Sequence, residues 1–523
     1  MREISRQKRM RRITAALATI VFSAAMFPAT AAMTWSFPQA LNTTAATDGN
    51  RHDYSPWLAT DGAGTWVAVW NSRNLAGGPF GDDMDIFFAR SVDDGETWTA
   101  PAAVDPAATS DALHDSDPMV HTDGTGHWLI AWRQWDQAAD SDIDLLYVVS
   151  IDGLNWSAPA WFNSDWATDI RRDHDGMPAI ASDANGTWVA VWYKVVDSPP
   201  GAEGSEGDIH VSRSTDHGLT WSAPELLHPS MDTDAGHDVT PDIATDGAGH
   251  WVVTWQSDNR IGTNGVADTD IHYSRSVDAG LTWSPPAAVN TDASTDELKD
   301  AYNDLATDGT TWVVTWTREW VTGGDEDILI ARSTDAGATW SGPDILNPYH
   351  DTDGMADDLS PRVATDGHGG WVVAWYAVDH VGFPWGPDRD LVFMRSDDGA
   401  VTWSAPAALN ASASVDLYAR DYTPGIWATD RGRWISAWRS DYDLGGTIGA
   451  DFDILFAGSC VPTLAGDHEC DGEVDLLDFR AFQVCFSSGF PVGADCAAFD
   501  ADGDDDLTVN DYLAFEAGLT GPN

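Results

Sequence analysis

The chain has 523 residues, of which 43% are hydrophobic, so it is long enough to bury a large core. Its formal net charge of −56 comes from 83 acidic residues against 27 lysines and arginines. A chain this acidic repels nucleic acid and anionic lipid and attracts cations, which argues against polyanionic partners. Adaptation to a salty medium, where surface carboxylates keep a protein soluble, is an alternative source of the charge.

The N-terminus has the three parts of a signal peptide, predicted over residues 1–31. Basic residues occupy positions 2–12, an apolar stretch follows from Ile13 to Phe27, and Ala29-Thr-Ala31 fits a small-residue cleavage site. Pro28 interrupts the apolar run, which is too short for the alternative of a membrane-spanning helix. No later segment is long and apolar enough to span a bilayer. We therefore expect a secreted or cell-surface protein.

An eight-residue pattern, S-x-D-x-G-x-T-W, recurs along the chain and predicts a hairpin turn. In the copy Ser276–Trp283, Gly280 can adopt the positive φ of a tight turn, and the side chains of Ser276 and Asp278 can accept hydrogen bonds from the turn amides. Including two altered copies, six occur at intervals of 57 to 64 residues, which indicates a repeat architecture. We call them the repeat turns: Ser91–Trp98, Ser150–Trp156, Ser214–Trp221, Ser276–Trp283, Ser333–Trp340 and Ser396–Trp403.

Each repeat predicts four strands. Their patterns are P-x-x-A-T-D, W-V-x-x-W, D-I-x-x-x-R-S and T-W-S-x-P-x-x-x-N, and the apolar alternation of the second is typical of a buried strand. The seventh repeat stops at Ser459 without a fourth strand, and the missing copy is Thr34–Asn42 at the other end of the chain. The sequence thus predicts a mainly β fold, a seven-bladed β-propeller over residues 32–459 that the N-terminal strand closes.

These repeats resemble the aspartate-box (BNR-repeat) propellers, of which the sialidases are the best-known members, over about residues 33–459. In that family the boxes lie away from the catalytic face, which implies a structural role for the repeat turns. The chain lacks the Arg-Ile-Pro motif of sialidases, and we assign no catalytic residue. Arginines expected on the family's active face, which can equally pair with neighbouring aspartates, are Arg51, Arg172, Arg420 and Arg439.

An aspartate stands three residues before the start of each P-x-x-A-T-D segment, on the face opposite the repeat turns. Such aspartates can cap the loops structurally, or they can form a carboxylate ring at the channel mouth that binds cations or sugar hydroxyls. The seven are Asp53, Asp115, Asp175, Asp238, Asp300, Asp358 and Asp421.

Four tryptophans fall outside the strand patterns, in loops of the same face. Exposed indoles beside carboxylates suit stacking on carbohydrate, whereas half-buried indoles would only anchor the loops. These candidate ligand-binding residues are Trp135, Trp166, Trp320 and Trp385.

Residues 460–523 predict a small α-helical domain with two Ca²⁺ loops. Oxygen ligands recur at loop positions 1, 3, 5, 7 and 12, and each loop leads into a helix with an aromatic face. The first loop offers Asp467, Glu469, Asp471, the carbonyl of Glu473, and Asp478. The second offers Asp500, Asp502, Asp504, Asp506 and Asp511, but Asp505 replaces the turn glycine that is Gly472 in the first.

This domain resembles the type I dockerins over about residues 464–519, which implies a cohesin-like partner on a scaffold or surface protein. Loop positions 10 and 11, often Ser-Thr in dockerins, are Leu476-Leu477 and Val509-Asn510 here. All four cysteines lie in the domain and suggest two disulfides of unknown connectivity in an exported chain: Cys460, Cys470, Cys485 and Cys496.

Three functions stay open at this point. We expect an extracellular, carbohydrate-binding propeller tethered through its calcium-dependent module. An exo-sialidase or another glycoside hydrolase is the first alternative, and it requires a cluster of arginines at the channel mouth to hold the substrate carboxylate. A structural cell-surface protein is the second.

Overall fold

The computed structural model describes the propeller with short gaps. The described residues are 33–47, 51–73, 83–106, 108, 112–135, 143–162, 174–196, 206–231, 236–259, 268–293, 298–320, 324–349, 356–378, 389–413, 416, 419–449 and 451–460, together with 482, 499, 511, 512 and 515. The predicted signal peptide lies outside them.

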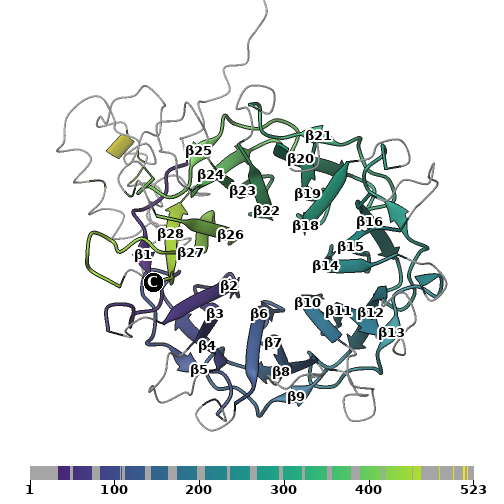
Figure 1. Cartoon of the computed structure of the whole chain (residues 1–523), viewed down its shortest axis with the longest axis horizontal. Coiled ribbons are helices and arrows are strands. Elements are labelled where there is room, and N and C mark those ends of the chain that lie inside the picture. Colours follow the sequence, from purple (N-terminus) through teal and green to yellow (C-terminus); the bar gives the residue numbers. More distant parts are fainter. Residues whose placement is uncertain are drawn as a thin grey trace, which may run out of the picture.

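Seven four-stranded antiparallel sheets surround a common axis, each with its first strand innermost (Figure 1). The first three blades are β2 (His52–Thr60), β3 (Trp66–Arg73), β4 (Met84–Ser91) and β5 (Ala102–Ala103); β6 (His114–Thr122), β7 (Trp128–Trp135), β8 (Asp144–Ser150) and β9 (Ala160–Trp161); β10 (His174–Ser182), β11 (Trp188–Val196), β12 (Glu206–Ser214) and β13 (Glu225–Leu226).

The remaining blades repeat this order. They are β14 (Asp238–Thr245), β15 (Trp251–Ser257), β16 (Asp270–Ser276) and β17 (Ala287–Ala288); β18 (Lys299–Thr307), β19 (Trp312–Glu319), β20 (Glu326–Ser333) and β21 (Asp344–Ile345); β22 (Asp358–Thr365), β23 (Trp371–Val378), β24 (Arg389–Ser396) and β25 (Ala407–Ala408); and β26 (Asp421–Ala428), β27 (Arg433–Ser440) and β28 (Asp453–Cys460) with β1 (Gln39–Ala40). The predicted seven blades are confirmed.

The core consists of the contacts between neighbouring blades. Side chains alternate across a strand, so the two tryptophans of β3, Trp66 and Trp70, pack on the preceding blade, while Val67 and Val69 pack on the next. Seven hydrophobic clusters result, one at each blade interface. Both tryptophans of every second strand are buried, which explains the W-V-x-x-W repeat.

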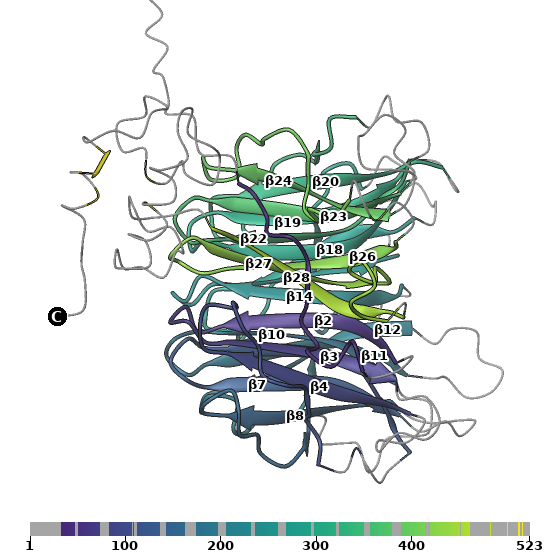
Figure 2. The ribbon, with the colours of Figure 1, turned by 90° about the vertical axis from the view of Figure 1, so that its left-hand side faces the viewer.

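The N-terminal strand closes the ring, as the sequence predicts. Gln39 and Ala40 of β1 pair with Phe456 and Leu455 of β28, and the Leu41 amide donates to the Ile454 carbonyl at 2.8 Å. Figures 1 and 2 show the purple N-terminal strand lying beside the yellow-green β28. The two ends of the propeller sequence therefore share one sheet, in which β1 is the outermost strand and covers the edge of β28.

The repeat turns have the hydrogen bonds predicted for them. In Ser276–Trp283 the Ser276 hydroxyl accepts from the Gly280 amide at 3.0 Å, Asp278 accepts from the Thr282 amide at 2.9 Å, and Gly280 has a φ of 75°. These turns join third to fourth strands. Together with the turns between first and second strands they define what we call the repeat-turn face, and the other connections define the opposite face.

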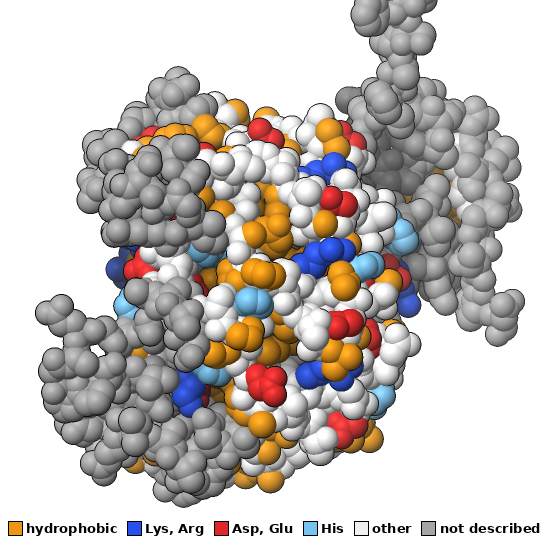
Figure 3. All heavy atoms as spheres, turned by 90° about the vertical axis from the view of Figure 1, so that its right-hand side faces the viewer, with side chains coloured by type: hydrophobic (Ala, Val, Ile, Leu, Met, Phe, Trp, Pro, Cys, Tyr) orange, Lys and Arg blue, Asp and Glu red, His pale blue; other side chains and the backbone are white. Residues whose placement is uncertain are grey.

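Outside the ring, the described residues of the C-terminal segment are few. Phe482, Phe499 and Phe515 are buried and in mutual ring contact, with centroids 5.2 to 5.9 Å apart. The described residues contain no helix that is long and apolar enough to cross a membrane. On the rim of the ring in Figure 3, hydrophobic, acidic, basic and histidine side chains are interspersed.

Candidate functional site

The seven aspartates expected at the channel mouth are buried in the blade interfaces. Each side chain is at most 4% exposed, in Asp53, Asp115, Asp175, Asp238, Asp300, Asp358 and Asp421. The asparagine that ends the fourth-strand pattern explains why. Asn42 donates to Asp53 at 2.7 Å and to Asp453 at 2.8 Å, so one amide links the first strand of one blade to the third strand of its neighbour.

The same arrangement recurs around the ring. Asn347 donates to both Asp327 and Asp358 at 2.6 Å, and the indole of Trp375 donates to the second oxygen of Asp358 at 2.7 Å. These contacts occupy the carboxylates within the protein. The geometry therefore supports the structural alternative for the seven aspartates.

Two of the four loop tryptophans are in the described part, and both are half-buried. Trp135 stacks on His114 with centroids 5.3 Å apart and lies 5.4 Å from the Arg133 guanidinium. The Trp320 indole donates to Asp327. Each indole thus has a partner in its own loop or a neighbouring strand, and the structure does not bring the two together. Trp166 and Trp385 lie outside the described residues.

Three arginines converge on a group of aromatic rings on the opposite face. The guanidinium carbon of Arg439 lies 4.3 Å from the ring centroid of Tyr422, 4.7 Å from that of Phe452 and 5.1 Å from that of Tyr54. The other two arginines lie equally close. Arg389 is 4.5 Å from the Tyr422 ring, and Arg420 is 5.1 Å from the Phe452 ring. We call these six residues the arginine–aromatic cluster.

The cluster is built from strand ends of three blades. Arg389 begins β24 in the sixth blade, and Arg439 lies near the end of β27 in the seventh. Tyr54 lies near the start of β2 in the first blade. Tyr422 belongs to β26, and Phe452 directly precedes β28. Because β1 closes the ring, the first and seventh blades are neighbours, and residues almost 400 positions apart meet at one place.

The positive charge of the cluster is only partly neutralised. Arg420 forms an ion pair with Asp441 at 2.7 Å, whereas no ion pair joins Arg389 or Arg439 to another described residue. The Nε atom of Arg439 is buried and has no hydrogen-bond partner within the described part of the chain. Burial lowers the pKa of Arg439, and the charges of Arg389 and Arg420 lower it further, against the opposing effect of two tyrosines. A bound anion would relieve this repulsion.

Guanidinium groups and aromatic rings in this arrangement suit an anionic ring-shaped ligand. Guanidinium binds carboxylate or sulfate with charge-assisted hydrogen bonds, and aromatic rings contact the apolar face of a sugar. Arg420 and Arg439 were among the arginines that the sequence places on this face. Arg389, Tyr54, Tyr422 and Phe452 were not recognised, since no local pattern marks them. Arg51 is described but is not part of the cluster, and Arg172 lies outside the described residues.

A tyrosine with a raised pKa lies next to the cluster. The ring centroid of Tyr376 lies 5.9 Å from the Arg389 guanidinium carbon. Burial raises the pKa of Tyr376, and the charge of Glu326 adds to this effect. Burial also raises the pKa of Glu326, together with the neighbouring carboxylates of Asp357 and Glu319. The Tyr376 hydroxyl could exchange a proton with a ligand bound beside Arg389.

Of the predicted calcium ligands, only Asp511 lies in the described part, where it is buried. The other nine, Asp467, Glu469, Asp471, Glu473, Asp478, Asp500, Asp502, Asp504 and Asp506, lie outside it. Among the cysteines, only Cys460 is described, at the end of β28. The calcium loops and the disulfides therefore stay predictions.

Comparison with known proteins finds only distant similarity to solved structures. No protein-family model and no curated protein matches the chain. A Hadza microbial sialidase shares 17% identity over 81% of this chain and 68% of its own, with a TM-score of 0.38.

Two further solved structures show similarly low sequence identity. The GH93 α-L-arabinofuranosidase of Fusarium graminearum, solved with arabinobiose, shares 13% identity over 66% of this chain and 93% of its own, with a TM-score of 0.44. A PL25 ulvan lyase shares 14% identity over 77% of this chain and 92% of its own, with a TM-score of 0.44. All three TM-scores lie below 0.5, so these similarities assign neither a family nor a function to the chain.

Proposed function

We propose that this protein is a secreted aspartate-box-type propeller that binds anionic saccharides at the arginine–aromatic cluster. The observation that carries the proposal is the placement of the Arg439 guanidinium. It lies within about 5 Å of three aromatic rings, beside two further arginines and without an ion pair to a described residue.

The overall charge makes this cluster distinctive. The chain has 27 lysines and arginines against 83 acidic residues, and three of those cations gather at one place. Like charges a few ångströms apart repel, so this arrangement is costly unless a ligand or a counter-charge offsets it. A carboxylate or sulfate group would supply the missing charge.

The aromatic rings favour a saccharide over a small inorganic anion. The Phe452 ring adjoins those of Tyr54 and Tyr422, with centroids 6.5 and 5.9 Å away, and all three rings are half-buried. Together they offer an apolar surface next to the charge, as uronic acids, sialic acids and sulfated sugars require. The sequence favours a neutral or cationic ligand because of an exposed aspartate ring, and the burial of those aspartates removes this objection.

A glycan array probed with the full chain in calcium buffer tests the proposal. We expect binding to acidic glycans and weaker binding to neutral glycans of the same backbone. Arg439→Met and Arg389→Met should each lose this binding. Lys299→Met removes a cation from an exposed site in the fifth blade and should leave it unchanged. Equal binding of acidic and neutral glycans, or full binding by both arginine variants, would contradict the proposal.

A glycoside hydrolase of sialidase type is the second candidate. Its requirement for clustered arginines is met by Arg389, Arg420 and Arg439. Tyr376 beside Arg389 is a candidate proton-transfer group, and the charge of Glu326 acts on it. Fluorogenic sialosides and glucuronides separate the two functions. Turnover that Tyr376→Phe and Glu326→Gln abolish would establish the hydrolase, whereas saccharide binding without turnover supports the binding protein.

We further propose that residues 460–523 tether the propeller to a cohesin-like domain in a calcium-dependent manner. The spacing of the oxygen ligands in both loops supports this role. If neither a saccharide nor a cohesin-like partner binds, the result would support the alternative of a structural cell-surface protein.

A further inference from the structure

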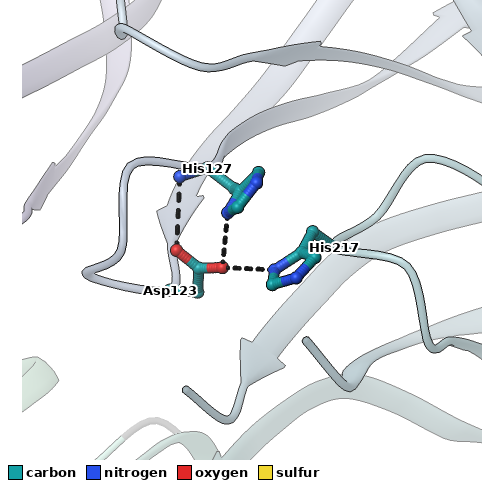
Figure 4. A group of neighbouring side chains, drawn as sticks. All are labelled: Asp123, His127 and His217. Carbon is teal, nitrogen blue, oxygen red and sulfur yellow. Dashed lines mark hydrogen bonds and ion pairs between the residues drawn. The ribbon is translucent and has the colours of Figure 1, made fainter. Parts of the chain in front are cut away.

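Two histidines and an aspartate meet on the repeat-turn face, far along the strands from the arginine–aromatic cluster (Figure 4). Asp123 and His127 belong to the turn between β6 and β7, and His217 belongs to the repeat turn after β12. The Nδ1 atoms of His127 and His217 lie 3.0 and 2.8 Å from the same oxygen, Asp123 Oδ2. The two imidazole rings stack with centroids 3.9 Å apart.

The carboxylate of Asp123 is held rigidly in this position. Its Oδ1 atom accepts hydrogen bonds from the amides of Thr125 and His127 at 2.8 and 3.2 Å, which leaves Oδ2 to the two imidazoles. The side chain of Asp123 is fully buried, while those of His127 and His217 are about one third exposed. Burial raises the pKa of Asp123, but the hydrogen bonds from His217 and the turn outweigh it and lower the pKa overall.

We propose that Asp123, His127 and His217 form a binding site for a divalent transition-metal ion such as Zn²⁺. Two imidazole nitrogens and one carboxylate oxygen are a donor set that suits zinc, cobalt and nickel better than calcium or magnesium. The three donor atoms lie within 4.8 Å of one another. The ion would replace the protons now shared between the imidazoles and the carboxylate, and solvent would reach its remaining coordination positions because both histidines are partly exposed.

The position of His217 distinguishes this site from the other blades. The residue has a φ of 61°, and the equivalent position of the fourth and fifth repeat turns holds Ala279 and Ala336, with similar values of 61° and 57°. The turn therefore requires a left-handed backbone but no histidine. The side chain of His217 reaches across the blade interface to Asp123, which an alanine side chain at this position could not do.

The fourth blade supplies an internal control. There His250 Nδ1 lies 2.6 Å from Asp246 Oδ2, the same pairing as His127 with Asp123. The repeat turn of the following blade has Ala336 where His217 stands in the third, so the third ligand is missing. The fourth blade therefore keeps the histidine–aspartate pair without the third ligand, and it also has Ala248 where Thr125 donates to Asp123 at 2.8 Å in the second.

Calorimetric titration of the tag-free full chain with Zn²⁺ tests the proposal, with excess calcium present to saturate the predicted calcium loops. We expect one equivalent of Zn²⁺ to bind, with Co²⁺ giving visible d–d absorption at the same site. His217→Ala and His127→Thr should each weaken binding at least tenfold. Both replacements occur at these positions in other blades, as Ala279 and Thr187, so the turns should still fold.

His250→Thr is the matched control and should leave the affinity unchanged. Ala336→His places a third ligand beside Asp246 and His250, and a second equivalent of bound Zn²⁺ in this variant would support the assignment. The proposal is wrong if the wild type binds no Zn²⁺, or if His217→Ala and His127→Thr both bind Zn²⁺ as tightly as the wild type does.

Discussion

Asp242 is a carboxyl group on the inner wall of the ring whose pKa is raised. Its carboxylate accepts the amides of Ile243 at 2.8 Å and of Leu305, in the next blade, at 2.7 Å. Asp304 occupies the equivalent position one blade further and is paired with Arg362 at 2.7 Å. Burial and the charge of Asp304 raise the pKa of Asp242 to about 7.

This shift predicts that the propeller loses stability as the pH rises from about 4 to 8. A carboxyl whose pKa is higher in the folded than in the unfolded protein binds more protons when folded. The contribution of Asp242 to the free energy of unfolding is complete below its unfolded pKa of 3.8. That contribution is lost as the pH passes through the folded pKa of about 7. Calorimetry should show a smaller difference in melting temperature between pH 5 and pH 8 for Asp242→Asn than for the wild type. An unchanged difference would show that Asp242 titrates normally.

At the scale of elements, ring closure depends on a strand of two paired residues and the asparagine that follows it. Leu41 is fully buried, and Asn42 donates to two buried aspartates, one in the first blade and one in the last. An unsatisfied buried polar group costs about 1–3 kcal/mol, so the Asn42 contacts stabilise the closure beyond the pairing of β1 with β28.

We predict that deletion of residues 33–43 lowers the melting temperature and causes association, because the edge of β28 becomes free to pair with another chain. Asn42→Ala keeps the strand and loses the hydrogen bonds of the side-chain amide, so it should cost about 2 kcal/mol and leave the protein monomeric. Thermal melts and gel filtration measure both effects. A monomeric deletion variant with an unchanged melt would rule out this role for β1.

The elements are predictable from the sequence because their determinants are local. The alternation of W-V-x-x-W sets the buried faces, Gly280 sets the turn, and the surplus copy at Thr34–Asn42 reveals the closure. Burial of the seven aspartates is not predictable in this way. The partner of Asp53 is Asn42, whose own pattern identifies it only as the end of a strand, and their contact depends on how two blades pack.

The arginine–aromatic cluster exists only in the closed ring. Tyr54 and Arg439 are separated by most of the propeller sequence, and no spacing rule relates them. The histidine site is partly local in sequence, because Asp123 and His127 share one turn, but His217 comes from the next blade. Sites built from several blades can be predicted once the order of the blades around the ring is known.

At the scale of the whole molecule, we predict that the C-terminal module melts independently of the propeller and needs calcium. Carboxylates packed in the two loops repel one another without the ion, so metal binding contributes directly to folding. Scanning calorimetry of the full chain in calcium should show a transition that EDTA abolishes, with the propeller transition retained. Identical traces in calcium and EDTA would remove the support for calcium loops.

The most direct test of the central claim compares one acidic oligosaccharide, taken from the array, with its methyl ester. The two ligands have the same shape, and only the acid carries the charge that Arg389, Arg420 and Arg439 would bind. Hydrogen bonds to charged groups contribute about 1.5–3 kcal/mol, so isothermal titration should show the ester binding roughly tenfold or more weakly. The Arg439→Met variant should bind both ligands with the same low affinity. Equal affinity of the wild type for acid and ester would contradict the assignment of this cluster as the anion-binding site.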